Sequence, residues 1–427
     1  MARYLSQNNI DNPLAKVEWV NLMLKGIIFT WCILWLVSCN RKPNQMPVTE
    51  INENDSLYVI DLDQQKLDVI NLSSIFSKVE LIVLETTEES ILGEIGVFQA
   101  FDSHLYILDR RYASKLFVFD RKGKLVPTIG NKGRGPGEYI SADHFTIDPE
   151  NKEIILLCDG GKTLNKYHLD GTFIDRVLIN QKLLYLYSDY IQYFDDKIYA
   201  NAFHRVKDPD EEDYLLQIID PVTGDQEARF LRASQHNKGW NERHYLAPGL
   251  FTPNIGGIPK FIPMLSDTVF SIDKNGISPF LAIKTKHKLT SDDVKKARQQ
   301  GTKSDEQYSF LNRTEKAHSI HYYLEFNDFI YFQYWHGRPY RVFFRPATND
   351  ISIVAYVRND VLYKNREETV RFMSADQNGV YEYIDAHSKA MEKLKDAVKK
   401  DELSIGRNRQ IAELSEEANP VIFYYSN

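Results

Sequence analysis

Apolar and polar residues alternate along most of the chain beyond residue 56, and the alternating runs recur with a period of about 50 residues. The segment YILDRRYASKLFVFDRKGKLVPTI can be laid over LLCDGGKTLNKYHLDGTFIDRVLI, for example. Asp120, Asp170 and Asp220 follow one another at intervals of 50, Asp273 comes 53 residues later, and Arg345 takes this place in a fifth copy. Alternation with a period of two predicts β-strands, and self-similarity at a fixed period predicts a repeat architecture.

A tight turn follows each of these recurring aspartates. Gly123, Gly171, Gly224 and Gly276 lie within the turns. Aspartate favours such turns because its carboxylate binds nearby backbone N–H groups, and glycine supplies the positive φ that tight hairpins use. We therefore predict a β-hairpin at each site and interpret the aspartates as structural rather than catalytic.

A second pair of alternating runs precedes each hairpin, as in HFTIDPENKEIILLCD. Four strands in about 50 residues is typical of a β-propeller blade. The sequence thus predicts an all-β fold over 56–427, a six-bladed β-propeller. The blades are expected near 95–130, 140–180, 185–232, 241–285, 318–358 and 370–427. The run VELIVL, residues 79–84, remains over, and we expect it to close the ring so that no sheet edge stays exposed.

Two segments interrupt the strand pattern and predict helical insertions, near 289–317 and 385–417. In the first, Thr290 or Ser291 is a plausible N-cap for DDVKKARQQ. In the second, Ala386, Ala390, Leu394 and Val398 recur every four residues, which predicts a helix with one narrow apolar stripe. Both are expected to pack on the propeller, with docking of a partner as the alternative.

The stretch IGNKGRGPGEY, residues 129–139, is the richest in glycine. A phosphate-binding loop would need a Gly-Lys-Ser/Thr sequence and a following helix. Here Pro136 removes a backbone donor, and the residues that follow alternate like a strand. We therefore predict a connector between two blades.

The hairpin KLFVFDRKGKLVPTIG, the following NKGRGPGEY, and then FTID and LDG resemble a family of Gram-negative bacterial lipoproteins. That family is described as six-bladed β-propellers related to NHL-repeat proteins. The resemblance is strongest over 80–180. It implies the propeller fold and an envelope location, but no settled activity and no catalytic residues.

The N-terminal segment has the features of a secretory signal. Lys25 precedes an apolar run from Gly26 to Val37, which is too short to span a membrane but suits a signal peptide. It ends in Leu-Val-Ser-Cys, which resembles a bacterial lipobox with Cys39 as the lipidated residue. We predict a signal peptide over 1–38, with Met23 as the true start, and a polar tether over 39–55. The expected location is the outer membrane, facing the periplasm or the cell surface.

Charge and cysteine content limit the possible functions. The 427 residues carry a formal net charge of −7, whereas a nucleic-acid-binding protein needs a basic surface. Three cysteines cannot build a disulfide framework. Cys158 lies in an apolar strand and is interpreted as a core residue. The expected partners are the membrane, through the lipid anchor, and a glycan, a peptide or an envelope protein, with no nucleic acid.

Candidate ligand-binding residues lie in long polar loops that carry aromatic side chains, since propellers bind ligands with the loops at one end of the channel. Flat rings beside forked donors suit a sugar or a peptide. Arg134 and Glu138 of the glycine-rich stretch are added as candidates for the channel mouth. The candidates are Arg134, Glu138, His204, Trp240, Arg243, His244, Tyr245, Trp335, His336, Arg338 and Tyr340.

The sequence favours a binding or scaffold module over an enzyme. It has no H-x-x-x-H or H-E-x-x-H pattern and no G-x-S-x-G elbow, so no cofactor is expected. The alternative is a metal-dependent hydrolase or lyase that holds calcium or zinc in the channel. Ligands for such a metal would come from several blades, with His104, His144 and His204 as candidates.

Overall fold

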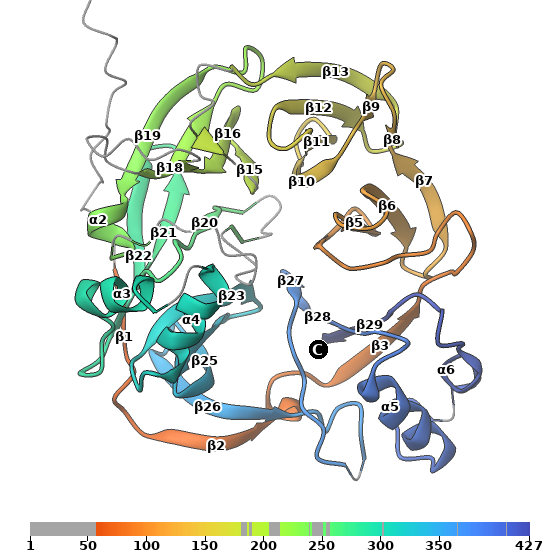
Figure 1. Cartoon of the computed structure of the whole chain (residues 1–427). Helices are drawn as coiled ribbons and strands as arrows, with labels where there is room; N and C mark the ends of the chain where they lie inside the picture. The colour runs from red at the N-terminus through yellow and green to blue at the C-terminus, as the bar shows by residue number, and fades with distance from the viewer. Residues whose placement is uncertain are drawn as a thin grey trace, which may run out of the picture. The chain divides into compact units, whose positions relative to one another are not determined.

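The computed structural model describes residues 57–180, 186–187, 190–204, 214–238, 240, 251–252, 257–300, 303–364, 366–406 and 408–427. The described residues belong to one compact unit, Val48–Asn427. Its sheets stand side by side around a common centre, as Figure 1 shows. The predicted six-bladed β-propeller with helical insertions is confirmed. The predicted signal peptide, tether and Cys39 lie outside the described residues.

The first three blades are four-stranded antiparallel sheets whose strands follow chain order. The strand bounds in blade 1 are β4 (Val97–Phe101), β5 (His104–Asp109), β6 (Lys115–Asp120) and β7 (Leu125–Ile129). Those in blade 2 are β10 (Ala142–Asp148), β11 (Glu153–Cys158), β12 (Thr163–His168) and β13 (Phe173–Leu178). Those in blade 3 are β15 (Ile191–Phe194), β16 (Lys197–Asn201), β18 (Tyr214–Ile219) and β19 (Gln226–Arg232).

The last three blades each take a further strand from the beginning of the described chain. In blade 4 the bridge of Phe251 to Phe261 takes the place of the first strand, and β20 (Lys260–Phe261), β21 (Thr268–Asp273) and β22 (Gly276–Lys284) are the second to fourth strands, followed by β1 (Tyr58–Asp61). Blade 5 contains β23 (His318–Phe326), β24 (Phe329–His336), β25 (Arg338–Arg345), β26 (Asp350–Arg358) and β2 (Lys66–Asn71). Blade 6 contains β27 (Ser374–Asp376), β28 (Gly379–Ile384), β29 (Val421–Ser426) and β3 (Lys78–Val83).

The segment 58–83 therefore forms a belt along the outside of three successive blades. β1 and β2 add in parallel to β22 and β26, and β3 pairs antiparallel with β29. The strand predicted from VELIVL is β3, and it completes blade 6 as expected. The additional strands β1 and β2 were not predicted.

The recurring aspartates lie at hairpins and bind the backbone, as predicted. Asp120 accepts the N–H groups of residues 122 and 124, and Asp220 accepts those of residues 222 and 223. Asp170 and Asp273 each accept one N–H two residues further on. These backbone bonds are the main cause of the lowered pKa of Asp170 and of Asp220. The four carboxylates are thus used in turn formation.

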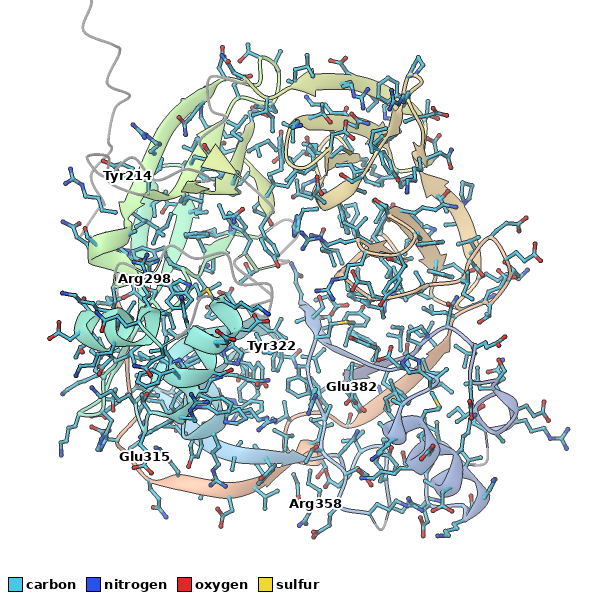
Figure 2. All side chains as sticks on the ribbon, viewed as in Figure 1. Tyr214, Arg298, Glu315, Tyr322, Arg358 and Glu382 are labelled. Carbon is cyan, nitrogen blue, oxygen red and sulfur yellow. The ribbon has the colours of Figure 1, made fainter. Side chains whose placement is uncertain are left out.

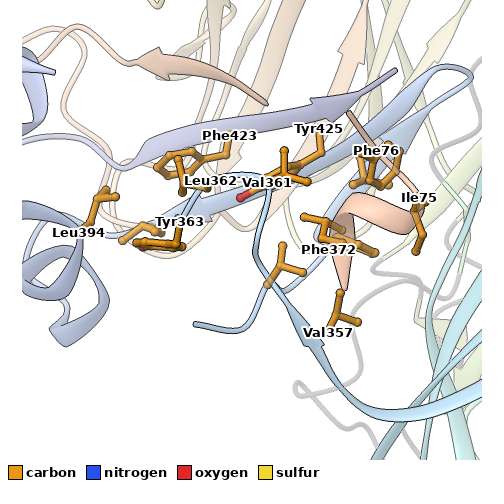
Figure 3. Close-up of a cluster of buried hydrophobic side chains, with 14 of the residues drawn as sticks. Ile75, Phe76, Val357, Val361, Leu362, Tyr363, Phe372, Leu394, Phe423 and Tyr425 are labelled. Atoms are coloured by element: carbon orange, nitrogen blue, oxygen red, sulfur yellow. The ribbon is translucent and has the colours of Figure 1, made fainter. Parts of the chain in front are cut away.

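The hydrophobic core lies between neighbouring blades, because each sheet buries both faces. Figure 3 shows the largest cluster, between blades 5 and 6, where Phe76, Phe372 and Tyr425 come from distant parts of the chain. Cys158 is fully buried in the cluster between blades 1 and 2, and burial raises its pKa well above the usual value. Its predicted core position is confirmed.

The described helices lie in four connections. They are η1 (Leu72–Ser74), α2 (Ala233–His236), α3 (Ser291–Arg298), α4 (Ser304–Arg313), α5 (Lys389–Lys399) and α6 (Arg409–Glu413). Thr290 caps α3 in a capping box with Asp293, as the sequence indicated. In α5 the N-cap is Ser388, so Ala386 precedes the helix and Ala390 is exposed. The buried stripe begins at Met391 instead.

The two ends of the propeller differ. Because the blade strands are antiparallel, the first-to-second and third-to-fourth strand turns share one end, which we call the hairpin end. The blade-to-blade connectors and the second-to-third strand loops share the other, the connector end. The hairpin end carries short turns such as 102–103, 195–196 and 327–328. Helices α2 to α6 all lie in connections at the connector end.

Two short sheets complete the described strands. β8 (Asn131–Lys132) pairs with β9 (Glu138–Tyr139), and β14 (Leu186–Tyr187) pairs with β17 (Phe203–His204). Both pairs belong to connections at the connector end.

Candidate ligand-binding site at the connector end

The inner strand of blade 5, β23, departs twice from regular pairing. Its register with β24 shifts between His318 and His321 and again between His321 and Leu324. Ser319 and Tyr322 have φ values of 61° and 50°. A left-handed backbone is costly for a residue with a side chain, and such bulges re-aim side chains and are common beside functional sites. The strand is thus distorted at the position that presents Tyr322.

Tyr322, Arg371 and Tyr383 form a cluster beside the inner edges of blades 5 and 6. Burial raises the pKa of both tyrosines, and the positive charge of Arg371 opposes part of this rise in each. Figure 2 labels Tyr322 beside the centre of the ring. Arg371 lies just before β27, and its side chain is exposed. We call these three residues the mouth cluster.

The polar groups of the mouth cluster are available to a ligand. Neither tyrosine hydroxyl, nor the Arg371 guanidinium, forms a hydrogen bond or ion pair with another residue in the described ranges. Both tyrosine side chains are partly exposed. An arginine near two tyrosines can pair with a carboxylate or with hydroxyl groups while the rings contact a flat molecular face.

A buried carboxylate lies directly beneath the mouth cluster. Glu382 on β28 accepts the backbone N–H of Arg371 at 3.0 Å and the hydroxyl of Tyr425 at 2.9 Å. Asn359 donates to the same hydroxyl at 2.7 Å. Burial raises the pKa of Glu382 to about 7. This network fixes the backbone from which the Arg371 side chain extends.

A second cation and ring lie at the connector end, from the β5–β6 loop of blade 1 and from the residue before β15 of blade 3. The Arg110 guanidinium is 5.5 Å from the ring of Tyr190, which also contacts His144. Arg110 forms no hydrogen bond or ion pair with another described residue. Burial lowers the pKa of His144 to about 3, so its ring is neutral and serves as a packing surface.

The candidates predicted in a loop over 334–341 lie instead in β24 and β25, on either side of Gly337, and are brought together in part. The Arg338 Nε donates to the Tyr340 hydroxyl at 3.2 Å, and its guanidinium is 5.0 Å from that ring. The His336 Nδ1 lies 3.2 Å from the Lys66 Nζ of the belt. Trp335 instead donates from its Nε1 to the Asn312 carbonyl at 2.7 Å and anchors α4.

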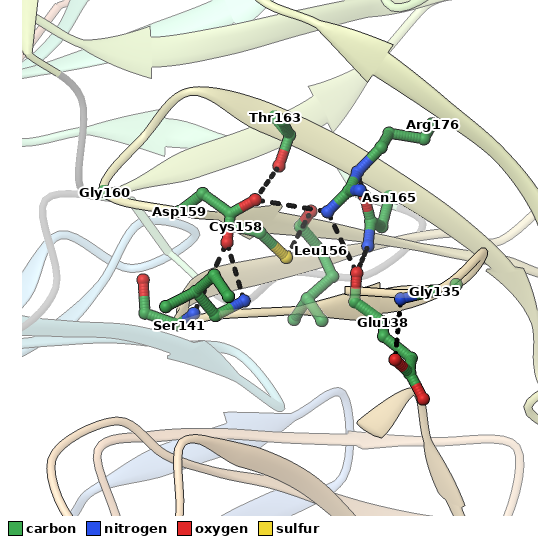
Figure 4. Close-up of polar contacts among 12 residues, drawn as sticks. Gly135, Glu138, Ser141, Leu156, Cys158, Asp159, Gly160, Thr163, Asn165 and Arg176 are labelled. Carbon is green, nitrogen blue, oxygen red and sulfur yellow. Dashed lines mark hydrogen bonds and ion pairs between the residues drawn. The ribbon is translucent and has the colours of Figure 1, made fainter. Parts of the chain in front are cut away.

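The glycine-rich stretch is a connector between blades 1 and 2, as predicted, and Figure 4 shows how it is fastened. The Glu138 carboxylate accepts the Gly135 N–H at 2.7 Å, and the backbone carbonyl of Glu138 accepts from the Arg176 guanidinium at 2.9 Å. Asp159 accepts from Ile140 and from Arg176. Glu138 is therefore used in holding the connector on blade 2, and only Arg134 of the two candidates there is exposed.

Several other candidates are not at the surface or lie outside the description. Trp240 is 1% exposed and packs with Leu265, Leu289 and the buried faces of α3 and α4. It is a core residue and does not face a ligand. His204 ends the short strand β17. Arg243, His244 and Tyr245 lie outside the described residues.

The histidines proposed for a metal do not form such a site in the described part of the chain. His104 begins β5 at the hairpin end, whereas His144 lies near the start of β10 at the connector end. Among the described residues, no three His, Cys, Asp or Glu side chains gather as a metal ion would require. The described residues therefore add no support for the hydrolase or lyase alternative.

Comparison with known proteins identifies the family. A family model described as Domain of unknown function (DUF4934) matches residues 57–426. The chain belongs to the DUF4934 family. No curated protein matches it. Among the residues with a described structure, no helix of this DUF4934 protein is long and apolar enough to cross a membrane.

The search of solved structures found similar chains at low identity. A protein from Bacteroides fragilis, described as exported, has 17% identity and a TM-score of 0.62, with 87% of this chain and 99% of that chain covered. A member of the DUF4221 family from Bacteroides vulgatus has 11% identity and a TM-score of 0.45, with 82% and 98% covered. The first likeness supports the fold.

The mouth cluster of this DUF4934 protein was not found from the sequence. Tyr322 lies in HSIHYYLEF, a run whose aromatic and histidine content was a weak signal. Arg371 and Tyr383 lie in separate strands or connectors without a motif. They become neighbours only because β23 and β27 are inner strands of adjacent blades.

Proposed function

We propose that this DUF4934 protein is an exported, lipid-anchored β-propeller that binds a ligand at the connector end of its channel. The observation that carries the proposal is the mouth cluster, with Tyr322 on a strained inner strand beside Arg371 and Tyr383. The ligand is proposed to be a glycan or peptide with an anionic group. The arginine would pair with that group, and the rings would pack on the adjoining apolar face.

A scaffold role for the helices has less support than a binding role. A docking helix would present large apolar side chains to solvent. The large apolar residues exposed among the described residues lie on strands and loops, and none belongs to α3, α4, α5 or α6. The helices bury their apolar stripes on the propeller instead.

The lipid anchor is the second part of the proposal. It rests on the apolar segment before Cys39 and on the described export of the structural neighbour from Bacteroides fragilis. Acylation at Cys39 would hold the propeller at the outer membrane on the tether. Replacing Cys39 with serine should then shift the protein from the membrane fraction to the soluble fraction of a Gram-negative host and remove fatty-acid labelling. Unchanged labelling in the Cys39→Ser variant would refute the anchor.

The binding function is tested by thermal unfolding of residues 57–427 with a panel of acidic and neutral oligosaccharides and peptides. A ligand that binds only the folded state adds about 2.7 kcal/mol of stability at a hundredfold excess over Kd. We expect one anionic class to raise the melting temperature. A panel without any shift, at millimolar concentrations, would contradict the proposal.

A further inference from the structure

A polar cavity of about 390 Å³ lies at the connector end, away from the mouth cluster. Its walls come from α2 after blade 3, the residues before β21, and the connector from blade 4 to α3. Nothing in the proposed function uses this cavity, and its side chains are mainly polar. The ones that matter here are His236, Lys238, Asp267, Thr268, Lys288 and Ser291.

Two lysines of the cavity share one carboxylate. The Lys238 Nζ lies 2.9 Å from one oxygen of Asp267, and the Lys288 Nζ lies 2.5 Å from the other. The side chains of Lys238 and Asp267 are 11% and 12% exposed, whereas that of Lys288 is 54% exposed. Asp267 thus holds two ammonium groups in fixed positions at the cavity wall.

The shared carboxylate leaves hydrogen-bond donors unused. Each ammonium has three N–H groups. Lys238 donates to Asp267 and to the Leu265 carbonyl at 2.6 Å, and Lys288 forms an ion pair with Asp267 alone, which occupies at most one of its N–H groups. Three N–H groups therefore remain. The hydroxyls of Thr268 and Ser291 also line the cavity, and neither forms a hydrogen bond with the described residues.

The cavity also carries an uncompensated positive charge. Two ammonium groups face one carboxylate, and burial lowers the pKa of His236, which keeps that ring neutral at pH 7. Burial lowers the pKa of Lys238, the Asp267 carboxylate opposes this shift, and Lys288 adds a smaller lowering effect. This excess lies in a chain whose formal net charge is −7.

Asp293 and the N-terminus of α3 do not compensate the charge. Asp293 of α3 is engaged by Lys316 at 2.6 Å and by the backbone N–H of Thr290. The same capping box uses the first turn of α3, so the helix N-terminus supplies no free site. The unused donors come from lysines and hydroxyls on three separate segments.

We propose that this cavity binds a small tetrahedral oxyanion, the phosphoryl or sulfuryl group of a small molecule. Donors on several walls suit an ion with oxygen atoms in all directions better than a planar carboxylate, and the two ammonium groups supply the charge. Lys238 and Lys288 bind the anion directly, and Asp267 positions them. The inference is independent of the mouth cluster.

The test measures the melting temperature of residues 57–427 in phosphate, sulfate, acetate and chloride at equal ionic strength and pH. The wild type should be stabilised by phosphate or sulfate and not by acetate or chloride. The Lys288→Met variant should weaken the apparent affinity at least tenfold. Lys274→Met is the matched control, because Lys274 is 80% exposed at a hairpin-end turn and loses the same charge. It should keep the wild-type response.

Two further arms identify the source of the oxyanion. Glucose 6-phosphate should compete with inorganic phosphate if the group belongs to a soluble sugar, and vesicles containing phosphatidylglycerol should bind if it belongs to a lipid. Either result supports the site when Lys288→Met abolishes it. The proposal is overturned if phosphate and sulfate act no better than chloride, or if Lys288→Met, with an unchanged melting temperature in chloride, responds like the wild type.

Discussion

At the scale of single residues, Glu382 is a buried group whose ionisation affects the stability of the fold. It is 7% exposed, and burial raises its pKa from the ordinary 4.5 to about 7. The folded protein therefore holds the proton more tightly than the unfolded chain. The protonated Glu382 side chain contributes about 3 kcal/mol to the free energy of unfolding below pH 4.5, and this contribution is lost as the pH rises towards 7.

We expect Glu382→Gln to remove this pH dependence. The variant should gain stability relative to the wild type as the pH is raised from 4.5 to 7, since it buries no charge. Urea unfolding at several pH values measures the difference. Glu416→Gln, at an exposed position, is the control and should follow the wild type. Parallel curves for wild type and Glu382→Gln would show that the carboxyl does not titrate in this range.

A second residue-scale prediction concerns the glycine connector. Gly137 has a φ of 72°, and a Cβ there would lie 2.8 Å from the ring of Phe173. Gly160 has a φ of 69° but no neighbour within 4 Å of such a Cβ. Gly160→Ala should cost about 1 kcal/mol for the backbone, and Gly137→Ala about 1–3 kcal/mol more for the clash. Equal free energies of unfolding for the two variants would mean that the connector shifts and so relieves the clash with Phe173.

The residue roles that could be predicted from the sequence are those set by local geometry. The turn aspartates recur at one place in each hairpin, so their backbone bonds followed from the repeat. The burial of Trp240 could not be predicted in this way, because it depends on α3 and α4, which lie more than 50 residues away in the sequence. Arg371 shows it again, since its neighbours come from two blades.

At the scale of elements, the belt over 58–83 explains how the ring is closed. Its three strands tie the beginning of the described chain to blades 4, 5 and 6, which come last in the sequence. β3 was predictable as an apolar run left over from the repeat. β1 and β2 could not be predicted. They add to the outer edges of blades 4 and 5, whose other strands already follow the repeat, so the pattern shows no missing strand for them to fill.

Replacing Ile60 tests the contribution of β1. Ile60 is fully buried between blades 4 and 5, whereas Val59 on the same strand is 53% exposed. Ile60→Ala should lower the free energy of unfolding by about 2–4 kcal/mol, and Val59→Ala by no more than about 0.5 kcal/mol. Chemical denaturation measures both. Similar small losses would mean that β1 is not held against the core.

At the scale of the whole molecule, the connections are distributed unequally between the two ends. The hairpin end consists of short turns whose aspartates are already bonded to the backbone. Both candidate sites lie at the connector end: the mouth cluster and the polar cavity lined by Lys238 and Lys288. The sequence predicted that long loops at one end of the channel bind a ligand, but not which loops approach the centre, since that depends on the order of blades in the ring.

The measurement that tests the central claim most directly compares two arginine variants. The panel ligand with the largest thermal shift is titrated calorimetrically into wild type, Arg371→Met and Arg338→Met. Arg338 is 46% exposed at the turn of blade 5 predicted from the sequence, and its loss removes the same charge. We predict that Arg371→Met weakens binding at least tenfold and that Arg338→Met leaves it unchanged. The reverse result would contradict the mouth cluster and place the site at the turn of blade 5.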